Sequence, residues 1–430
     1  MLLLSHPTGN ANVRHAALGL ARAGLLAEFR SCLAVDPGAA WLSLLPGGLA
    51  GQLRRRAVPD ELLPFARSRP LRELVRLAAG RGGFGGRLTR HETGACCVDA
   101  VYRDLDRACA RRLARGGLSG VYAYEDGAFE SFRAARSRGL ATFYDQPIGY
   151  WRAARRILTE EAEREPEWAG TIVGNRDSAA KTERKDEELR LADVVFAATS
   201  FTKATLAEHP GFTAPVHVLP YGAPAGDPAA PRSPYAAPDQ PLRVLYVGSL
   251  GQRKGLSYLF AAAGLASRSI ELTLVGTKPA EPCAALERAL GRHHWIASLP
   301  HAGILDLMRR SDVLVFPSLF EGFGLVILEA MAQGVPVITT PHTAGPDLIT
   351  DGTDGFLVPI RDAAAIAGRL DALHRDRARL AAMGAAARAR AARFTWAAYE
   401  TGLARFVREH LAAASLAGGA TSAPPRPDGA

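Results

Sequence analysis

Short, continuous apolar runs alternate with longer amphipathic segments along most of the chain. Runs such as Leu242–Val247 and Ile270–Val275 carry few polar positions, which is typical of strands buried on both faces of a parallel sheet. The segments between the runs repeat apolar residues at helical spacing. The pattern predicts strands at residues 1–4, 120–124, 141–144, 194–197, 216–219, 242–247, 270–275, 312–316 and 335–339. Strands separated by helices predict an α/β fold with parallel sheets.

A proline-rich stretch divides these elements into two groups. Prolines in residues 223–241 are too closely spaced for a core strand or helix, so we expect a linker there. A chain of 430 residues is also too long for one hydrophobic core. We expect two Rossmann-like, doubly wound domains at 1–222 and 242–393, a helix at 394–415 that packs back toward the first domain, and a disordered tail at 416–430.

Charge and composition narrow the class of protein. The net charge is +9, and residues 53–115 hold fifteen arginines against seven acidic residues. Few aromatic residues are interleaved with these arginines, which argues against a nucleic-acid partner. The basic amphipathic segment Leu71–Ala79 instead suggests that the Arg54–Arg115 region contacts an anionic membrane peripherally. A solvated arginine face is the other interpretation.

The sequence gives no sign of export, membrane spanning or metal binding. No apolar run reaches the roughly 18 residues of a spanning helix, and residues 1–7 lack the basic and long apolar regions of an export signal. Five cysteines without zinc-type spacing fit a reducing compartment, so we expect a cytoplasmic protein, soluble or peripheral on the membrane. Asp104-Leu105-Asp106 falls inside a predicted helix, where we expect a solvated face and no metal.

The loop between the predicted strands 312–316 and 335–339 carries the strongest functional pattern. Two glutamates flank a glycine-bracketed turn that runs into a helix. Loops at the carboxyl ends of parallel strands bind ligands, and a helix N-terminus offers unpaired amides to a phosphate. The residues concerned are Glu321, Gly322, Phe323, Gly324, Leu325 and Glu329.

This segment, with seven residues between the glutamates, resembles the signature of the retaining glycosyltransferases of family four. Residues 244–255, with Gly248, Ser249, Arg253 and Lys254, are similar to the first strand and basic loop of that family's donor domain. Residues 345–359 are similar to the segment after the signature, although Asp347 stands where a glutamate is more usual. The resemblance implies the GT-B fold, in which two Rossmann-like domains face each other across a cleft.

The resemblance also implies roles for these residues. Arg253 and Lys254 would stabilise the departing diphosphate in place of a metal, so no metal and no other cofactor is expected. Glu321 would meet the sugar in the transition state, and Glu329 would hold the ribose. The alternatives without a catalytic role are a solvated basic turn for Arg253 and Lys254 and, for the two glutamates, carboxylates that only complement the helix dipole. The further donor-binding residues would be Gly322, Phe323, Gly324, Leu325, Gly248 and Ser249.

The acceptor side is less clearly marked. Gly9 and Asn10, in the turn after the first strand, are candidate sugar or acceptor contacts, with a plain turn as the alternative. Asp145 follows the strand at 141–144 and is a further candidate. His301 and His342 lie near the cleft by sequence order, and we interpret both as structural residues.

We therefore expect a retaining, metal-independent glycosyltransferase that moves a sugar from a nucleoside-diphosphate sugar to a hydroxyl acceptor, in bacterial glycan, polysaccharide or glycolipid synthesis. The partners would be the nucleotide sugar and a glycan or lipid-linked glycan. A nucleotide-sugar epimerase or a phosphorylase of the same fold is an alternative, although no pyridoxal-phosphate lysine can be identified. A non-catalytic scaffold that only binds a nucleotide sugar is the alternative from a different class.

Overall fold

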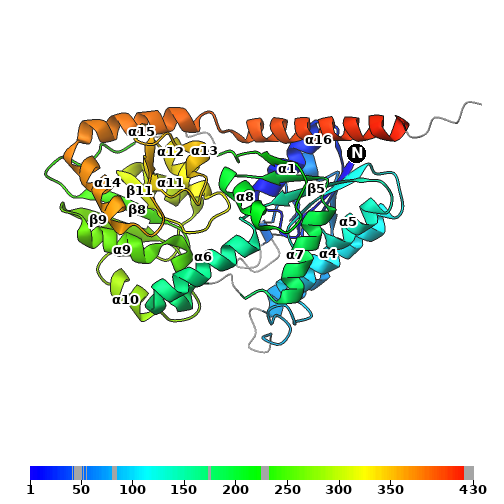
Figure 1. Cartoon of the computed structure of the whole chain (residues 1–430), viewed down its shortest axis with the longest axis horizontal. Coiled ribbons are helices and arrows are strands. Elements are labelled where there is room, and N and C mark those ends of the chain that lie inside the picture. Colours follow the sequence, from blue (N-terminus) through cyan, green and yellow to red (C-terminus); the bar gives the residue numbers. More distant parts are fainter. Residues whose placement is uncertain are drawn as a thin grey trace, which may run out of the picture.

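The computed structural model describes residues 1–40, 42, 51, 53–54, 56–79, 85–172, 176–223 and 232–420. Two lobes lie side by side, the first coloured blue to green and the second green to orange (Figure 1). A long helix runs from the second lobe over the first, and another helix lies between the lobes at the opposite edge (Figure 1).

The first lobe is built on a seven-stranded parallel sheet with the order β3-β2-β1-β4-β5-β6-β7. Its strands are β1 Leu2–Ser5, β2 Leu26–Ser31, β3 Ala66–Ser68, β4 Gly120–Tyr124, β5 Ala141–Gln146, β6 Val194–Ala197 and β7 Val216–Val218. Its helices are α1 Ala11–Arg22, η2 Asp60–Leu62, α3 Leu71–Ala79, α4 Val98–Leu113, α5 Phe129–Arg136, α6 Trp151–Arg164, η3 Pro166–Thr171, α7 Ala179–Leu191, α8 Ser200–Thr205 and η4 Leu206–Glu208.

The second lobe has a six-stranded parallel sheet with the order β10-β9-β8-β11-β12-β13. Its strands are β8 Leu242–Val247, β9 Ile270–Val275, β10 His294–Ile296, β11 Val313–Phe316, β12 Val337–Thr339 and β13 Gly355–Leu357. Its helices are η5 Gln252–Lys254, α9 Leu256–Leu265, α10 Ala284–Leu290, α11 His301–Arg310, α12 Leu325–Ala332, α13 Gly345–Leu348, α14 Ala363–Arg375 and α15 Arg377–Ala391.

In both sheets the strand order reverses beside the first strand of the lobe, between β1 and β4 and between β8 and β11. Doubly wound sheets bind ligands in the crevice outside the strand ends at such a switch point. The sheets thus provide one ligand-binding position in each lobe.

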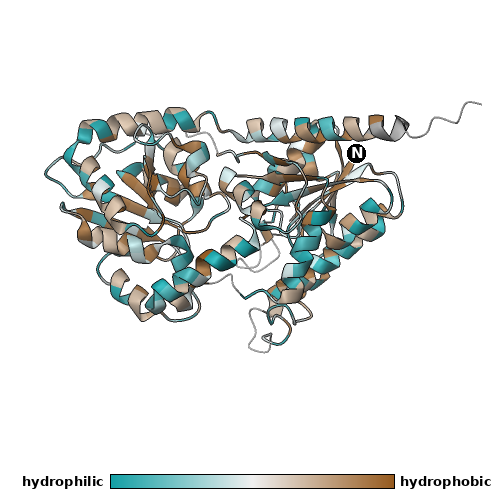
Figure 2. Cartoon of the chain, in the orientation of Figure 1, coloured by the Kyte–Doolittle hydropathy of each residue, from teal (hydrophilic) through white to brown (hydrophobic). Residues whose placement is uncertain are grey.

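The predicted strands are all present within one or two residues at each end. Four further strands, β2, β3, β10 and β13, were not predicted. They are short or carry charged residues, as in the Ala-Arg-Ser of β3, and lie at or near a sheet edge. The strands of the sheets are coloured mostly hydrophobic, whereas hydrophobic and hydrophilic positions alternate along the helices (Figure 2).

Helix α16, Trp396–Ala420, returns from the second lobe to pack on α1 of the first. Trp396 stacks on His15 with ring centroids 4.1 Å apart, and the buried Glu400 binds Arg22 and His15. The helix extends to Ala420, so residues 416–420 are helical where we expected the tail to be disordered. Residues 421–430 lie outside the described residues. None of the described helices combines the length and the apolar character needed to cross a membrane.

Candidate functional site

The signature loop lies at the switch point of the second sheet, next to the turn that carries the two predicted cations. Gly255 ends that turn with φ +71°, and a Cβ there would lie 2.1 Å from the carbonyl oxygen of Pro317. The two loops therefore approach each other more closely than any side-chain-bearing residue allows. The carbonyl of Arg253 completes the contact by accepting a hydrogen bond from the Leu319 amide at 2.9 Å.

The structure brings Arg253, Lys254 and Glu321 together. The ammonium of Lys254 is in contact with the carboxylate of Glu321, and Arg253 Nη1 lies 3.5 Å from the same carboxylate. Arg253 also donates to the carbonyl of Phe320 at 2.6 Å. Burial lowers the pKa of Lys254, as does the adjacent Arg253 guanidinium, so the ammonium depends on the neighbouring carboxylate to stay charged.

Helix α12 starts directly after this carboxylate. Gly324 is its N-cap with φ +81°, and no side chain caps the first turn. A left-handed backbone at this point favours glycine, which explains the second glycine of the Gly322-Phe323-Gly324 turn. Two cations and an uncapped helix N-terminus thus face the same loop, an arrangement that suits a phosphate.

Glu329 lies one turn further along α12. Its side chain is 17% exposed, and its carboxylate Oε1 is 2.9 Å from Nε2 of His301 on α11. We had interpreted His301 as a structural loop residue, whereas here it is an exposed partner of a predicted ribose-binding carboxylate. His342 is half-buried, hydrogen-bonded to the Leu319 carbonyl and stacked on Phe201, which fits the structural role expected for it.

The remaining donor-side candidates make separate contacts within the second lobe and with the first. The amide of Gly248 is bonded to the Val275 carbonyl, and the carbonyl of Ser249 accepts the Tyr246 hydroxyl at 2.8 Å. The Phe323 ring packs on Tyr221 of the first lobe with centroids 5.1 Å apart, and Leu325 is partly exposed in the first turn of α12.

The first lobe touches the signature loop directly. The Gly322 carbonyl accepts hydrogen bonds from Thr199 Oγ1 at 3.0 Å and Thr202 Oγ1 at 3.3 Å. A Cβ at Gly322 would lie 1.9 Å from the carbonyl oxygen of Pro147. Asp347, which stands where a glutamate is more usual, accepts hydrogen bonds from the amide and the hydroxyl of Ser200. The loop therefore sits at the contact between the lobes.

Two of the three acceptor-side candidates lie together just before α1, and the third is enclosed in the lobe. Gly9 has φ +57°, and its amide donates to Nδ1 of His6 at 3.1 Å. Burial lowers the pKa of His6 to about 3, so the ring is neutral and can accept this bond. Asn10 is exposed at the start of α1. Asp145 is 2% exposed and bonded to Tyr122, so its carboxylate is enclosed in the lobe and not presented to a ligand.

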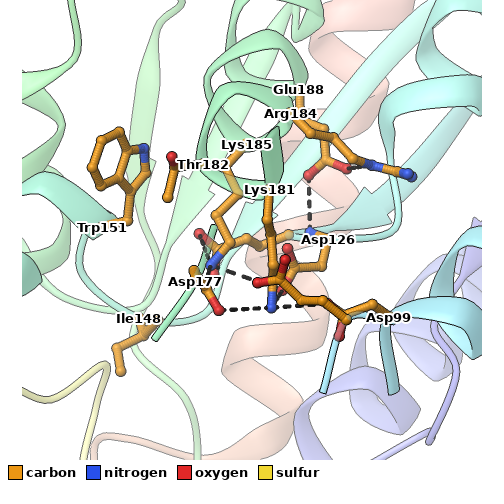
Figure 3. A network of polar contacts seen from close by, with 12 residues as sticks. Asp99, Asp126, Ile148, Trp151, Asp177, Lys181, Thr182, Arg184, Lys185 and Glu188 are labelled. Carbon is orange, nitrogen blue, oxygen red and sulfur yellow. Dashed lines mark hydrogen bonds and ion pairs between the residues drawn. The ribbon is translucent and has the colours of Figure 1, made fainter. Parts of the chain in front are cut away.

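A polar cluster that the sequence did not reveal occupies the switch point of the first sheet (Figure 3). Lys181 and Lys185 point from α7 toward carboxylates at the end of β4 and at the starts of α4 and α7 (Figure 3). Lys181 Nζ is 2.9 Å from Asp99 and 3.0 Å from Asp177, and Lys185 Nζ is 3.0 Å from Asp177. A cavity of about 100 Å³ beside the cluster is lined by Glu92, Asp99, Arg103, Asp126, Ser178, Ala180, Lys181 and Arg184.

This cluster adjoins the signature loop through β5. Glu125, next to Asp126, accepts a hydrogen bond from Gln146 at 3.2 Å, and the following residue, Pro147, lies against Gly322. Asp126 has φ +69°, a left-handed conformation that is uncommon for non-glycine residues, although aspartate adopts it more readily than most. The two switch points thus face each other across the contact between the lobes.

The expected solvated face at Asp104-Leu105-Asp106 is wrong for one residue. Asp104 pairs with the exposed Arg69, but Asp106 is fully buried. Its carboxylate accepts the amides of Glu130 and Ser131 at 2.8 and 2.9 Å, because the N-terminus of α5 abuts α4 and needs acceptors. Its role is to cap α5.

Residues 230–390 match the family model described as glycosyl transferases group 1. The glycogen synthase of Mycobacterium tuberculosis is 30% identical over 280 residues, which cover 62% of this chain and 64% of that protein. The chain thus aligns with just under two thirds of this relative's length.

Solved structures match over nearly the whole chain. Sucrose-phosphate synthase from Thermosynechococcus elongatus superposes with a TM-score of 0.67 at 20% identity, covering 96% of this chain and 99% of that one. Anabaena HepE in complex with UDP and glucose superposes with a TM-score of 0.61 at 16% identity, covering 95% and 99%. The fold expected from the family resemblance is confirmed: two Rossmann-like lobes in the GT-B arrangement.

Proposed function

We propose that this protein is a retaining glycosyltransferase that transfers a sugar from a nucleoside-diphosphate donor to a hydroxyl acceptor in bacterial glycan synthesis. The observation that carries the proposal is the meeting of Arg253, Lys254 and Glu321 at the uncapped start of α12. The group 1 match over residues 230–390 and the likeness to a structure that holds UDP and glucose support it.

The diphosphate would lie between η5 and the start of α12. There Arg253 and Lys254 would exchange part of their contact with Glu321 for contacts to the phosphates, and the first amides of α12 would add hydrogen bonds. Fixed cations at this position stabilise the charge that builds on the leaving diphosphate. We therefore propose that transfer proceeds without a metal ion.

Glu321 and Glu329 would hold the other parts of the donor. Displacing Lys254 from Glu321 frees a carboxylate beside the sugar, where it can accept from sugar hydroxyls or stabilise a positively charged transition state. Glu329 is partly exposed, and its carboxylate can accept both hydroxyls of a ribose. His301 would then contact the same hydroxyls from the opposite side.

The acceptor would approach from the first lobe. The cavity of the first lobe is lined by carboxylates, which can accept hydrogen bonds from sugar hydroxyls, and by ammonium groups, which can donate to them. The cavity lies at a switch point that adjoins the signature loop. Gly9 and Asn10 border the same sheet edge at the end of β1. We place a hydroxyl-bearing acceptor here, which replaces Asp145 as the expected acceptor contact.

An anionic membrane surface is a further proposed partner. On α3, Leu71 and Leu74 are 74% and 42% exposed, and Leu88 is 44% exposed among the exposed Arg87 and Arg90. Exposed leucines among arginines suit the boundary between lipid headgroups and acyl chains. Binding to vesicles with and without phosphatidylglycerol tests this: Leu71→Asp should weaken binding to anionic vesicles, and equal binding to neutral vesicles would contradict the charge argument.

An epimerase or phosphorylase of the same fold and a non-catalytic scaffold are less favoured. Arg253, Lys254 and Glu321 are all present and in contact, which an inactive relative has no need to keep. Thermal-shift measurements with uridine, guanosine and adenosine diphosphates and their sugars test the donor site. One of these should raise the Tm of the wild type, and Glu329→Ala should abolish that shift. No shift with any of them would contradict the proposal.

A further inference from the structure

Helix α6 follows β5 of the first lobe in sequence but packs against the second lobe (Figure 1). Its Ile157 and Leu158 are buried together with Leu319 and Phe320, which directly precede Glu321. The 3-10 helix η3 continues the contact, because Trp168 stacks on Phe260 of α9 with ring centroids 5.9 Å apart. A segment of the first lobe is thus part of the wall of the donor site.

A carboxylate of the first lobe binds three side chains at the start of α6. Asp186 on α7 accepts hydrogen bonds from the Tyr150 hydroxyl at 2.5 Å, from Trp151 Nε1 at 2.6 Å and from Arg152 Nη2 at 2.9 Å. Asp186 lies one residue beyond Lys185 of the polar cluster, which Trp151 also adjoins (Figure 3). The acceptor-side cluster and the start of α6 therefore share one helix.

The far end of α6 is held on the second lobe by another buried carboxylate. Glu161 is 0% exposed and accepts from Gln252 Nε2 at 2.6 Å, Arg361 Nε at 2.7 Å and Tyr258 Oη at 3.3 Å. Burying a charge is costly unless it is paired, and Arg361 supplies the pair. The hydrogen bond to Gln252 is not needed for that charge balance.

Gln252 is the first residue of the turn that carries Arg253 and Lys254. Its side chain is fully buried, accepts the Ser257 amide at 3.0 Å and donates to Ser257 Oγ at 2.6 Å. Its own amide donates to Thr171 Oγ1 of η3 at 2.9 Å. Both the side chain and the backbone of this residue are therefore fixed by the α6–η3 segment.

We propose that Glu161 is a positioning residue, which acts through Gln252 to hold the Arg253–Lys254 cations in the geometry that binds the donor diphosphate. This inference rests on the proposed function of that turn. Cations stabilise a developing charge only if they are fixed before it appears, and a turn of three residues cannot fix itself. The first lobe thereby sets the donor-binding geometry of the second.

The test compares affinity for a diphosphate with affinity for its nucleoside, because only the diphosphate reaches the cations. Calorimetry would use uridine, guanosine and adenosine diphosphates, each with its nucleoside, and continue with the base that binds. Glu161→Gln should reduce the preference for the diphosphate about tenfold while nucleoside affinity stays unchanged. Glu160→Gln is the matched control, because Glu160 also pairs with Arg361, at 3.1 Å, but is 45% exposed and does not contact Gln252.

Lys254→Ala distinguishes a failure of the positioning role of Glu161 from a failure of the proposed donor site. If Lys254→Ala loses the diphosphate preference and Glu161→Gln keeps it, the positioning role is refuted and the donor site stands. If Lys254→Ala keeps the preference, the donor site itself is refuted. Should Glu161→Gln not fold, Thr171→Val removes only the hydroxyl that accepts the Gln252 amide, and it should lower the same preference; an unchanged preference there refutes the positioning role.

Discussion

Asp145 makes the stability of the first lobe depend on pH in an unusual direction. The carboxyl group is 2% exposed, and the hydroxyl of Tyr122 donates a hydrogen bond to it at 2.6 Å. Burial raises its pKa from the ordinary 3.8 to about 7, and the single hydroxyl donor lowers it only in part. The group is therefore protonated in the folded protein at pH values where it is ionised in the unfolded chain.

The sign and size of the effect follow from that difference. Between about pH 4 and pH 7 the folded state holds a proton that the unfolded state has released, so stability is fully present below this window and falls as the pH rises through it. Each unit between two pKa values is worth about 1.4 kcal/mol, so the whole window amounts to about 4 kcal/mol. Asp145→Asn keeps an acceptor for Tyr122 and has no such proton to lose.

Urea unfolding followed by circular dichroism from pH 4 to pH 8 measures this difference. Wild type and Asp145→Asn should have similar free energies of unfolding at pH 4, and the variant should be the more stable by up to about 4 kcal/mol at pH 8. Asp60→Asn, at an exposed position, controls for the general effect of removing a carboxylate. A difference that stays constant from pH 4 to pH 8, or a wild type that gains on the variant as the pH rises, would show that the carboxylate is ionised in the folded protein.

Two further substitutions probe the contact between the lobes and the core of the second lobe. Gly322→Ala should lower the Tm and abolish nucleotide binding, because a Cβ would lie 1.9 Å from the Pro147 carbonyl oxygen. Gly264→Ala in α9 is the control: its Cβ meets open space, so the Tm and nucleotide binding should stay intact. Equal behaviour of the two variants would contradict the close approach of Gly322 to Pro147. Asp312→Asn should cost about 3 kcal/mol in the free energy of unfolding, because the fully buried carboxylate at the start of β11 pairs with Arg243; a loss below about 1 kcal/mol would mean that the pair is not stabilising.

The sheets were predictable wherever their strands are buried on both faces. Such strands are continuous apolar runs, and β4 and β6, which are buried throughout, have the predicted bounds. The strands β3 and β10 were not predicted, because edge positions leave their side chains partly exposed and no apolar run marks them in the sequence. The proximity of Arg253, Lys254 and Glu321 was predictable because one short turn and one loop carry them.

The polar cluster of the first lobe could not be predicted in the same way. Its members come from the end of β4 and the starts of α4 and α7, and only the sheet topology brings them together. The one available signal was Glu125-Asp126-Gly127 directly after a predicted strand, a position where polar residues gather around ligands. Asp145 carried the same signal, but its side chain points into the lobe, which a pattern of strand ends does not reveal.

The proposed function requires that this chain cleaves a nucleotide sugar at the Arg253–Glu321 site. The most direct measurement is the release of nucleoside diphosphate from UDP-, GDP- and ADP-sugars, with EDTA present, by wild type and Glu321→Gln. We predict release from one donor that persists in EDTA and falls about a hundredfold in the variant. Tight diphosphate binding without release from any of these donors, or release that Glu321→Gln leaves unchanged, would contradict cleavage of a nucleotide sugar at this site.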